Sequence, residues 1–249
     1  IRRVFREDVA LEDVANIVIT HGHGDHYAGL ASPELQGKTV FVHSSDSEAI
    51  RDYDAGYYEW MDFNRKLARV AGDCFLPNES SIFVPQTFSS ALSNHQLVEV
   101  EDGDIIINGY RVYHTPGHCP GHICLKVGAA LFLGDHILSS TTPHQSPRSR
   151  HHGLGLEAYL ASLRKIAEIG EILGLAGHED TIFNVSQRAL EIETFHHQRL
   201  TEIMNLCQRH RSLYQLTDEY YKLHPEVLGG SISGLPDETR CAAIEEIAT

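Results

Sequence analysis

The sequence predicts a mixed α/β (α+β) protein that is followed by a helical C-terminal part. Up to about residue 185, short runs of β-branched and aliphatic residues alternate with longer amphipathic segments, and beyond that point only helical spacing remains. The 249 residues, 42% of them hydrophobic, are enough to bury the core of one or two domains. We therefore expect a main domain over residues 1–185 and a small helical domain over residues 186–249.

In the first half, strands are expected where a short β-branched run lies between turn residues. The first two such runs each lead to a histidine, and a long helical region from Ser44 to Val70 follows them. The dipeptide Asn108-Gly109 between two apolar runs is typical of a type I′ hairpin turn. The strand candidates in this half are residues 14–20, 38–43 and 97–100 and the hairpin over residues 105–113.

The second half begins with another strand pair and ends in helices. Gly128 separates the two strand candidates, and the polar residues 139–153 form a loop whose length indicates function or mobility. Leucine and isoleucine at helical spacing predict the next helix, and a strand that ends in a histidine loop follows it. The expected elements are strands over residues 122–127, 130–135 and 171–176 and helices over residues 155–169, 186–209, 212–222 and 236–248.

Composition limits the kinds of binding partner and the cellular location that are expected. The net charge of −14 argues against a long polyanion as partner, because affinity for nucleic acid rests largely on the neutralisation of phosphates. The five cysteines are scattered without a C-x-x-C pair, so neither a disulfide framework nor a thiolate zinc site is expected. No apolar run reaches the roughly 20 residues that a bilayer requires, and the charged first residues do not resemble a signal peptide. We expect a cytoplasmic protein with no membrane partner.

The segment THGHGDH, residues 20–26, concentrates side chains that bind metal ions. Zinc and similar ions take imidazole nitrogen and carboxylate oxygen at about 2.0–2.2 Å. Residues two apart in an extended turn point the same way, so His21 and His23 can hold one ion while Asp25 and His26 reach a second. The motif therefore predicts two neighbouring metal positions.

Two ions need more ligands than this one segment supplies. The candidates are His118 in HTPGHCPGH, Asp135 in FLGDH and His178 in GLAGHED. Each of them lies where a predicted strand gives way to a loop, which is where a rigid frame can present a side chain. We expect all three side chains to converge on the THGHGDH segment.

From about Val14 to Asp180 the sequence resembles the metallo-β-lactamase superfamily of hydrolases. Four motifs occur in that family's order: THGHGDH, TPGHCPGH, GD after a hydrophobic strand, and a late GH. The resemblance implies that His21, His23 and His118 hold the first metal, that Asp25, His26 and His178 hold the second, and that Asp135 bridges both.

The same resemblance implies the architecture. Members of the family form a four-layer αββα sandwich, with two mixed sheets face to face, helices outside and the metals at one edge. They generally carry several strands before the first histidine motif, whereas only twenty residues precede it here, so N-terminal strands are expected to be missing or trimmed. The helical tail resembles the winged-helix-like domain that ends some lactamase-like proteins.

The resemblance also implies two Zn²⁺ ions, with iron or manganese as the alternatives. Histidine rather than glutamate at position 23 favours the zinc-type hydrolases over the diiron flavoproteins of the superfamily. Two dications lower the pKa of a shared water from 15.7 toward about 7, so a metal-bound hydroxide would be the nucleophile. Asp25 and Asp135 would help to hold and orient it, and they are the expected catalytic residues.

Several functions remain open at this point. The favoured one is hydrolysis of a small-molecule ester, thioester or amide-like bond. TPGH-x-x-GHICL-type spacing also resembles glyoxalase II, but its basic glutathione-binding residues are not recognisable. An endoribonuclease or phosphodiesterase is the first alternative: the net charge opposes it, while the tail and four residues favour it, namely Arg148, Arg150, His151 and His152. The others are a mononuclear-iron oxidoreductase of the persulfide dioxygenase kind and a protein with a vestigial metal site whose tail mediates interaction.

The sequence also predicts roles for the remaining histidines and for the tail. His122 is interpreted as a supporting residue of the metal site, and His136, His144, His151 and His152 as solvated loop residues rather than substrate contacts. His43, His196 and His197 are expected to be structural. The acidic last helix argues against DNA binding by the tail, although RNA stays open as a partner. A homodimer is expected through the apolar residues of the long helix: Leu190, Phe195, Leu200, Ile203 and Leu206.

Overall fold

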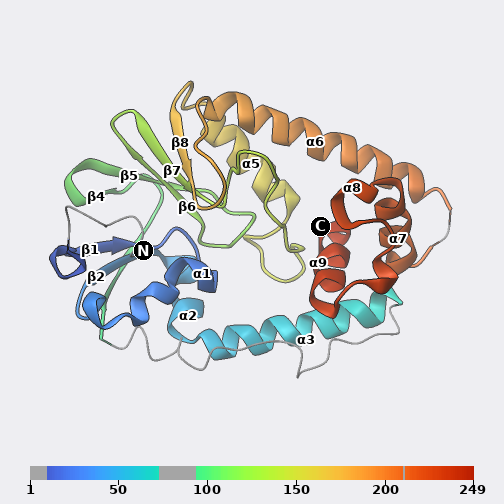
Figure 1. Ribbon diagram of the computed structural model, residues 1–249, viewed down its shortest axis with the longest axis horizontal. Coiled ribbons are helices and arrows are strands. Elements are labelled where there is room, and N and C mark those ends of the chain that lie inside the picture. The colour runs from blue at the N-terminus through green and yellow to red at the C-terminus, as the bar shows by residue number, and fades with distance from the viewer. Residues whose placement is uncertain (1–9, 73–93, 210) are drawn as a thin grey trace.

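The computed structural model describes residues 10–72, 94–209 and 211–249, and its two β-sheets lie on the left of Figure 1, opposite the C-terminal helices. The first sheet contains three parallel strands in the order β1-β2-β3, and the second contains five strands in the order β4-β5-β6-β7-β8. The strands are β1 (Asn16–Val18), β2 (Thr39–His43), β3 (Gln96–Val100), β4 (Ile105–Ile106), β5 (Tyr110–His114), β6 (Ile123–Val127), β7 (Ala130–Gly134) and β8 (Leu173–Ala176).

The second sheet is mixed, and the pairing of its last two strands, β7 and β8, bears on the position of the site. Strands β4 to β7 pair antiparallel in chain order, whereas β7 and β8 run parallel with Leu131 opposite Gly174. A parallel pair needs a crossover connection, which is supplied by the loop after β7 and a helix. The carboxyl ends of β7 and β8 therefore lie at the same edge of the sheet.

The hairpin between β4 and β5 differs from the predicted type I′ turn. Ile106 pairs with Tyr110, so the loop contains the three residues Ile107 to Gly109 instead of two. Ile107, Asn108 and Gly109 all have positive φ, at 38°, 55° and 104°. The sequence pattern located the turn correctly but not the register of its strands. Three residues, instead of the two of a type I′ turn, adopt left-handed backbone angles.

Helices cover the sheets and form the C-terminal part. The region predicted as helical over residues 44–70 is split at Asp52 into two helices, and the other predicted helices are present with similar bounds. The α-helices are α1 (Gly24–Tyr27), α2 (Ser44–Arg51), α3 (Tyr53–Ala71), α5 (Leu156–Ala167), α6 (Val185–Leu206), α7 (Leu213–Leu223), α8 (Pro225–Leu228) and α9 (Asp237–Ala248). Short 3-10 turns lie at Leu11–Asp13, Ala28–Ala31, Pro33–Leu35, Ile107–Gly109 and Ile232–Gly234.

Apolar clusters hold these layers together. Val100, Val112 and Ile123 are buried together between the two sheets, with Val18 and Phe41 packed against them. A larger cluster of aliphatic and aromatic side chains joins the second sheet to α5 and α6, and it includes Leu133 and Leu163, neither of them exposed. Burial of one such side chain contributes about 1.5–3 kcal/mol. Two face-to-face sheets with helices outside agree with the predicted αββα arrangement.

The tail is helical, and two long helices connect it with the sheets. Figure 1 shows α3 and α6 running from the sheet region to the bundle of α7, α8 and α9. Ala71 of α3 and Ile244 of α9 are buried in the same cluster as Tyr221 of α7. Since the first half of α6 packs on the second sheet and its last turns pack on the bundle, the division into two domains at residue 185 stays a prediction.

The predicted dimer surface on α6 is only partly available. Leu190 and Phe195 are exposed, at 54% and 41%. Leu200, Ile203 and Leu206 pack instead against the two cores of the same chain, because α6 turns this face toward the second sheet and the bundle. The homodimer remains a prediction that rests on the first two residues. Of the helices in residues 10–72, 94–209 and 211–249, none is both long enough and apolar enough to span a bilayer.

Candidate metal centre

The seven predicted ligands all lie at the same edge of the two sheets. His21 follows β1, His23 is the N-cap residue of α1, and α1 itself carries Asp25 and His26. The backbone N–H of Ile123 donates to the carbonyl of Thr20 at 2.8 Å, which joins this segment to β6 of the other sheet. The remaining donors follow strand ends of the second sheet: His118 between β5 and β6, Asp135 after β7 and His178 after β8.

Three of the histidines form what we call the inner group: His21, His23 and His118. His21 Nε2 and His23 Nδ1 are 3.2 Å apart, and the metal-binding atoms of all three histidines lie within 4.8 Å of one another. His21 is not exposed at all, and His118 is 7% exposed. The thiol of the buried Cys119 lies within the same 4.8 Å, although no pattern in the sequence indicated it as a ligand.

Three other side chains form the outer group: Asp25, His26 and His178. His178 Nε2 lies 3.2 Å from both His26 Nε2 and Asp25 Oδ2, and His26 Nε2 lies 3.5 Å from Asp25 Oδ2. This group faces solvent, because the side chains of Asp25 and His178 are 61% and 50% exposed.

Asp135 lies between the two groups. Its Oδ2 is 3.2 Å from His26 Nε2 and 3.4 Å from His178 Nε2, both in the outer group. The same oxygen is 3.9 Å from His21 Nε2 and 3.9 Å from His118 Nε2, both in the inner group. One carboxylate is thus within reach of both positions, which is the place that the sequence predicted for a bridging ligand.

The contacts among these donors suit metal ions better than hydrogen bonds. Two ring nitrogens that both bind one ion at about 2.0–2.1 Å stand slightly more than 3 Å apart, as His21 and His23 do. His118 Nε2 and Asp135 Oδ1 are buried and have no hydrogen-bond partner in the part of the chain that is described. A buried polar atom without a partner costs about 1–3 kcal/mol, and an ion would remove that cost. The donor set therefore fits a metal ion on each side of Asp135.

The protonation of the inner group is also suited to metal binding, which requires neutral imidazole. Burial lowers the pKa of His21 and His23 far below the usual range, and the neighbouring histidines lower both further. Burial likewise lowers the pKa of His118 to about 4. For His26 burial acts in the same direction, but the hydrogen bond to Asp135 and the charges of both nearby carboxylates raise its pKa.

The family follows from a sequence comparison. The sequence model of the metallo-beta-lactamase superfamily matches residues 1–173. This chain belongs to that superfamily. Among curated metallo-beta-lactamase relatives, the probable metallo-hydrolase YqjP of Bacillus subtilis (strain 168) is 25% identical over 201 residues, which cover 77% of this chain and 62% of that protein. An atrochrysone carboxyl ACP thioesterase of Aspergillus fumigatus is 32% identical over 182 residues, or 70% of this chain and 41% of that protein.

A solved metallo-beta-lactamase structure extends the match into the tail. A metallo-beta-lactamase family protein from Thermus thermophilus superimposes with a TM-score of 0.70 at 25% identity, over 96% of this chain and 73% of that one. This similarity confirms the predicted fold, including a helical C-terminal part. The chain spans only part of the length of the curated relatives, at 62% and 41% of the two proteins above.

Residues outside the seven candidate donors hold this site in place. His122, predicted as a supporting residue, accepts the backbone N–H of Asp135 on Nε2 at 3.1 Å, and its Nδ1 donates to Thr115 Oγ1 at 2.8 Å. Glycine at position 177 is required by close approach, since a Cβ there would lie 2.5 Å from Asp135 Oδ1. His122 therefore orients the strand end that carries Asp135 and does not join the donors.

The sequence does not predict one contact that supports the site, because that contact is made by a backbone carbonyl. His118 Nδ1 donates to the carbonyl of His144 at 2.6 Å, and His144 Nε2 lies 3.0 Å from Glu245 Oε2 on α9. Glu245 is 2% exposed, so the last helix reaches the loop beside the metal centre. The sequence marks His144 only as a loop histidine, and nothing in it shows that residues 101 positions apart meet. The expectation of a solvated residue is wrong for His136, which is fully buried because its ring packs against the buried Tyr159 of α5.

The loop over residues 139–153 is anchored at its start and lies against the second histidine motif. Glu179 accepts from the backbone N–H of Ser140 at 2.6 Å and from Ser139 Oγ at 3.1 Å. Partial burial acts to raise the pKa of Glu179, but the hydrogen bonds from Thr141 and Ser140 outweigh it and lower the pKa to about 2. Gly155 N–H donates to the carbonyl of Gly117 at 3.4 Å, which closes the far end of the loop.

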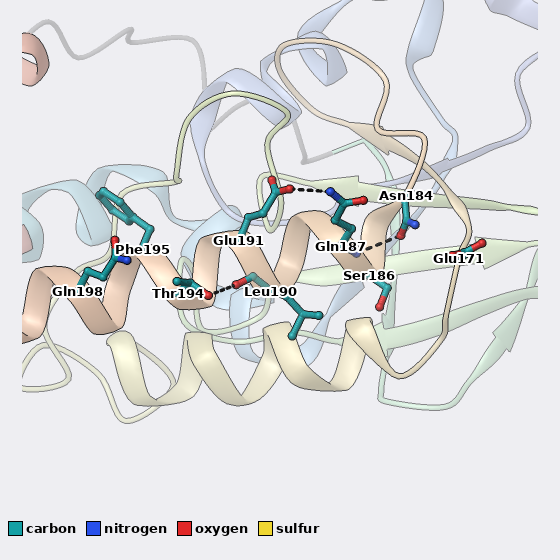
Figure 2. Close-up of a pocket in the computed structure, with 9 residues that line it drawn as sticks. All are labelled: Glu171, Asn184, Ser186, Gln187, Leu190, Glu191, Thr194, Phe195 and Gln198. Carbon is teal, nitrogen blue, oxygen red and sulfur yellow. Dashed lines mark hydrogen bonds between the residues drawn. The ribbon is translucent and has the colours of Figure 1, made fainter.

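An open groove runs along the outer side of α6, away from the metal centre (Figure 2). Its polar side chains bond with each other or with the helix: Gln187 Nε2 donates to Glu191 Oε1 at 3.0 Å, and Thr194 Oγ1 donates to the carbonyl of Leu190 at 2.8 Å. None of the seven predicted ligands lines it. We assign no ligand to this groove.

Proposed function

We propose that the chain is the metal-binding part of a hydrolase that cleaves a thioester bond. The observation that supports this most is the convergence of the inner and outer groups on Asp135, in a chain of the metallo-beta-lactamase superfamily. We propose two metal ions, with His21, His23 and His118 holding one, Asp25, His26 and His178 holding the other, and Asp135 between them. Zinc suits this set of nitrogen and oxygen donors, with iron or manganese as alternatives.

When bound, such ions lower the pKa of a coordinated water and withdraw electrons from the carbonyl that is attacked. The chain's own residues place this chemistry. Asp135 carries a carboxylate into the centre of the site, and Asp25 presents an exposed carboxylate at its open edge, where it can accept a hydrogen bond from the attacking water. The buried inner histidines are held neutral, so they remain free to bind metal at neutral pH.

A thioester fits the site better than an amide because of the leaving group. A thiol has a pKa near 8.5, so the thiolate can depart without a strong proton donor, whereas an amine must be protonated as it leaves. The inner histidines cannot supply that proton, because their ring nitrogens that face the centre would hold the metal ion. The thioesterase from A. fumigatus, at 32% identity, supports the same bond type.

The phosphodiester alternative has less support. Arg148, one of the cations that favoured it, is paired with Glu157 at 2.8 Å. In the tail, Arg199 is bonded to Glu246, and Arg211 lies 2.7 Å from Glu219. These cations are therefore engaged by carboxylates of the same chain, and the net charge of −14 repels a polyanion.

A substrate panel tests the proposal. The protein is freed of metal with a chelator, reloaded separately with Zn²⁺, Fe²⁺ and Mn²⁺, and assayed with an acyl thioester, the matching oxygen ester, a lactone, a phosphodiester and RNA. We expect metal-dependent cleavage with the thioester fastest. Faster cleavage of the phosphodiester or of RNA, or thioester cleavage that survives metal removal, would overturn it.

A further inference from the structure

The two loops that carry the inner group meet on one buried carboxylate, that of Asp46 in the first turn of α2. Asp46 Oδ2 accepts the backbone N–H of Gly22 at 2.8 Å, and Oδ1 accepts the backbone N–H of Gly121 at 2.7 Å. Gly22 stands between the two histidines of HGH, and Gly121 follows the inner-group histidine of HCPGH. Each oxygen therefore holds one of the two histidine-bearing loops.

The fold leaves this carboxylate little freedom. β2 ends at His43, whose ring Nδ1 accepts the backbone N–H of Ser45 at 3.2 Å and so starts α2 between the two loops. Asp46 is 3% exposed, so bulk solvent has little access to its oxygens. The approach is so close that a Cβ at position 121 would lie 2.6 Å from Asp46 Cγ, which requires glycine there.

We propose that Asp46 is a positioning residue of the metal centre, which sets the spacing between the HGH loop and the His118 loop and thereby the geometry of the inner donors. Hydrogen bonds from backbone N–H groups to a carboxylate are stronger than those between neutral groups, so one side chain can fix both loops. This inference rests on the proposed function only in that the inner group holds a metal ion.

Metal binding by the purified chain tests the inference directly. Metal-free protein is titrated with Co²⁺ alone, whose visible absorption reports the number and geometry of its ligands. In Asp46→Asn one oxygen still accepts, but the amide group turns a donor toward the second backbone N–H, and in Asp46→Ala both bonds are lost. We expect the dissociation constant for the inner Co²⁺ to rise about tenfold in Asp46→Asn and more in Asp46→Ala, with an altered spectrum in both.

Asp218→Asn is the matched control. Asp218 likewise accepts a backbone N–H, that of Ile232 at 2.9 Å, but it lies in the tail. We expect the Asp218→Asn protein to be less stable than the wild type and to give an unchanged Co²⁺ spectrum. Where circular dichroism shows Asp46→Ala to be unfolded, Gly121→Ala provides a second variant, because its added methyl group displaces the same carboxylate.

Wild-type Co²⁺ affinity and spectrum in folded Asp46→Asn and Gly121→Ala would overturn the inference. The titration does not measure hydrolysis. A chain that binds Co²⁺ but cleaves no thioester therefore overturns the proposed function, and the Co²⁺ data still decide the role of Asp46.

Discussion

The inner and outer donor groups lie side by side but are held in opposite ways. His21 and His118 of the inner group are buried, and the second ring nitrogen of each contacts the protein: His21 Nδ1 lies 3.1 Å from Thr20 Oγ1, and His118 Nδ1 donates to the carbonyl of His144. Within the described ranges, the short contacts recorded for the side chains of Asp25 and His178 are to other donors of the centre. The fold therefore supports the inner side chains through contacts outside the centre, and we expect the outer side chains to be ordered chiefly by a bound ion.

The largest effect is expected from the residue that the two groups share. Asp135→Ala removes the carboxylate between them, so we expect hydrolysis to fall to the background rate and the metal content to fall below two ions per chain, as measured by elemental analysis. Asp13→Ala, which removes an exposed carboxylate that is not one of the seven donors, serves as the control. Two bound ions with full activity in Asp135→Ala would contradict the bridging position.

A pair of histidine variants tests the comparison itself. We expect His21→Ala to lose the inner ion, and His178→Ala to keep it and lose only the outer one, because the inner donors are supported by the fold. After dialysis, His178→Ala should retain about one ion per chain and a rate at least about tenfold above that of His21→Ala. Equal losses in the two variants would show that the groups do not differ in preorganisation.

His196 is a buried histidine outside both donor groups, so it shows how burial alone, without metal binding, changes the pKa of an imidazole. Burial, helped by the nearby Arg199, lowers the pKa of His196 to about 4, whereas in the unfolded chain it is about 6.5. As the pH falls from 6.5 to 4, the unfolded chain binds a proton that the folded chain does not, so the free energy of unfolding decreases by about 2–3 kcal/mol in this window. Thermal unfolding of metal-free protein at pH 7 and pH 5 measures the loss.

The matched variant for this measurement is His196→Phe. Neither ring nitrogen of His196 has a hydrogen-bond partner among the residues that are described, so phenylalanine replaces the ring without leaving an acceptor unpaired. We expect the variant to lose part of the decrease in stability between pH 7 and pH 5. An unchanged decrease would assign the pH dependence to other groups.

The smallest effect is expected from the tail. Glu245→Gln weakens the contact that holds His144, whose carbonyl accepts from His118, so we expect a two- to fivefold weaker inner ion, on the order of 1 kcal/mol or less, and an unchanged outer ion. Glu202→Gln is the control, since Glu202 makes the same kind of contact with His224 at 2.8 Å elsewhere in the chain. A larger loss of metal affinity at the outer position than at the inner one would contradict the assignment of this support to the inner group.

Strand periodicity and motif order predicted most of this molecule, because the information they use is local. Residues 38–43 form β2 nearly as expected, and Asp135 and His178 lie at strand ends because the hydrophobic run before each was recognisable. The seven donors could be listed in advance because a family pattern supplies long-range contacts that periodicity does not contain. The hairpin at Asn108 was placed but misregistered, because turn type depends on the pairing of the flanking strands.

The supports of the site could not be predicted in this way. Asp46 looks like an ordinary residue of a helix start, and its partners are backbone N–H groups, which nearly every residue possesses. The contact between His144 and Glu245 joins a loop to the last helix, and no motif marks either residue. Leu200 and Ile203 were assigned to a partner surface because an amphipathic helix shows which face is apolar but not which neighbour covers it.

The shared position of Asp135 has an electrostatic consequence for the whole chain. Five of the seven donors are imidazoles, which carry no negative charge, so only Asp25 and Asp135 bring negative charge to the centre. Two dications bound there would leave a local surplus of two positive charges in a chain whose net charge is −14. The potential would then change sign over a short distance, from the negative surroundings to the positive mouth of the centre, where the outer group opens to solvent.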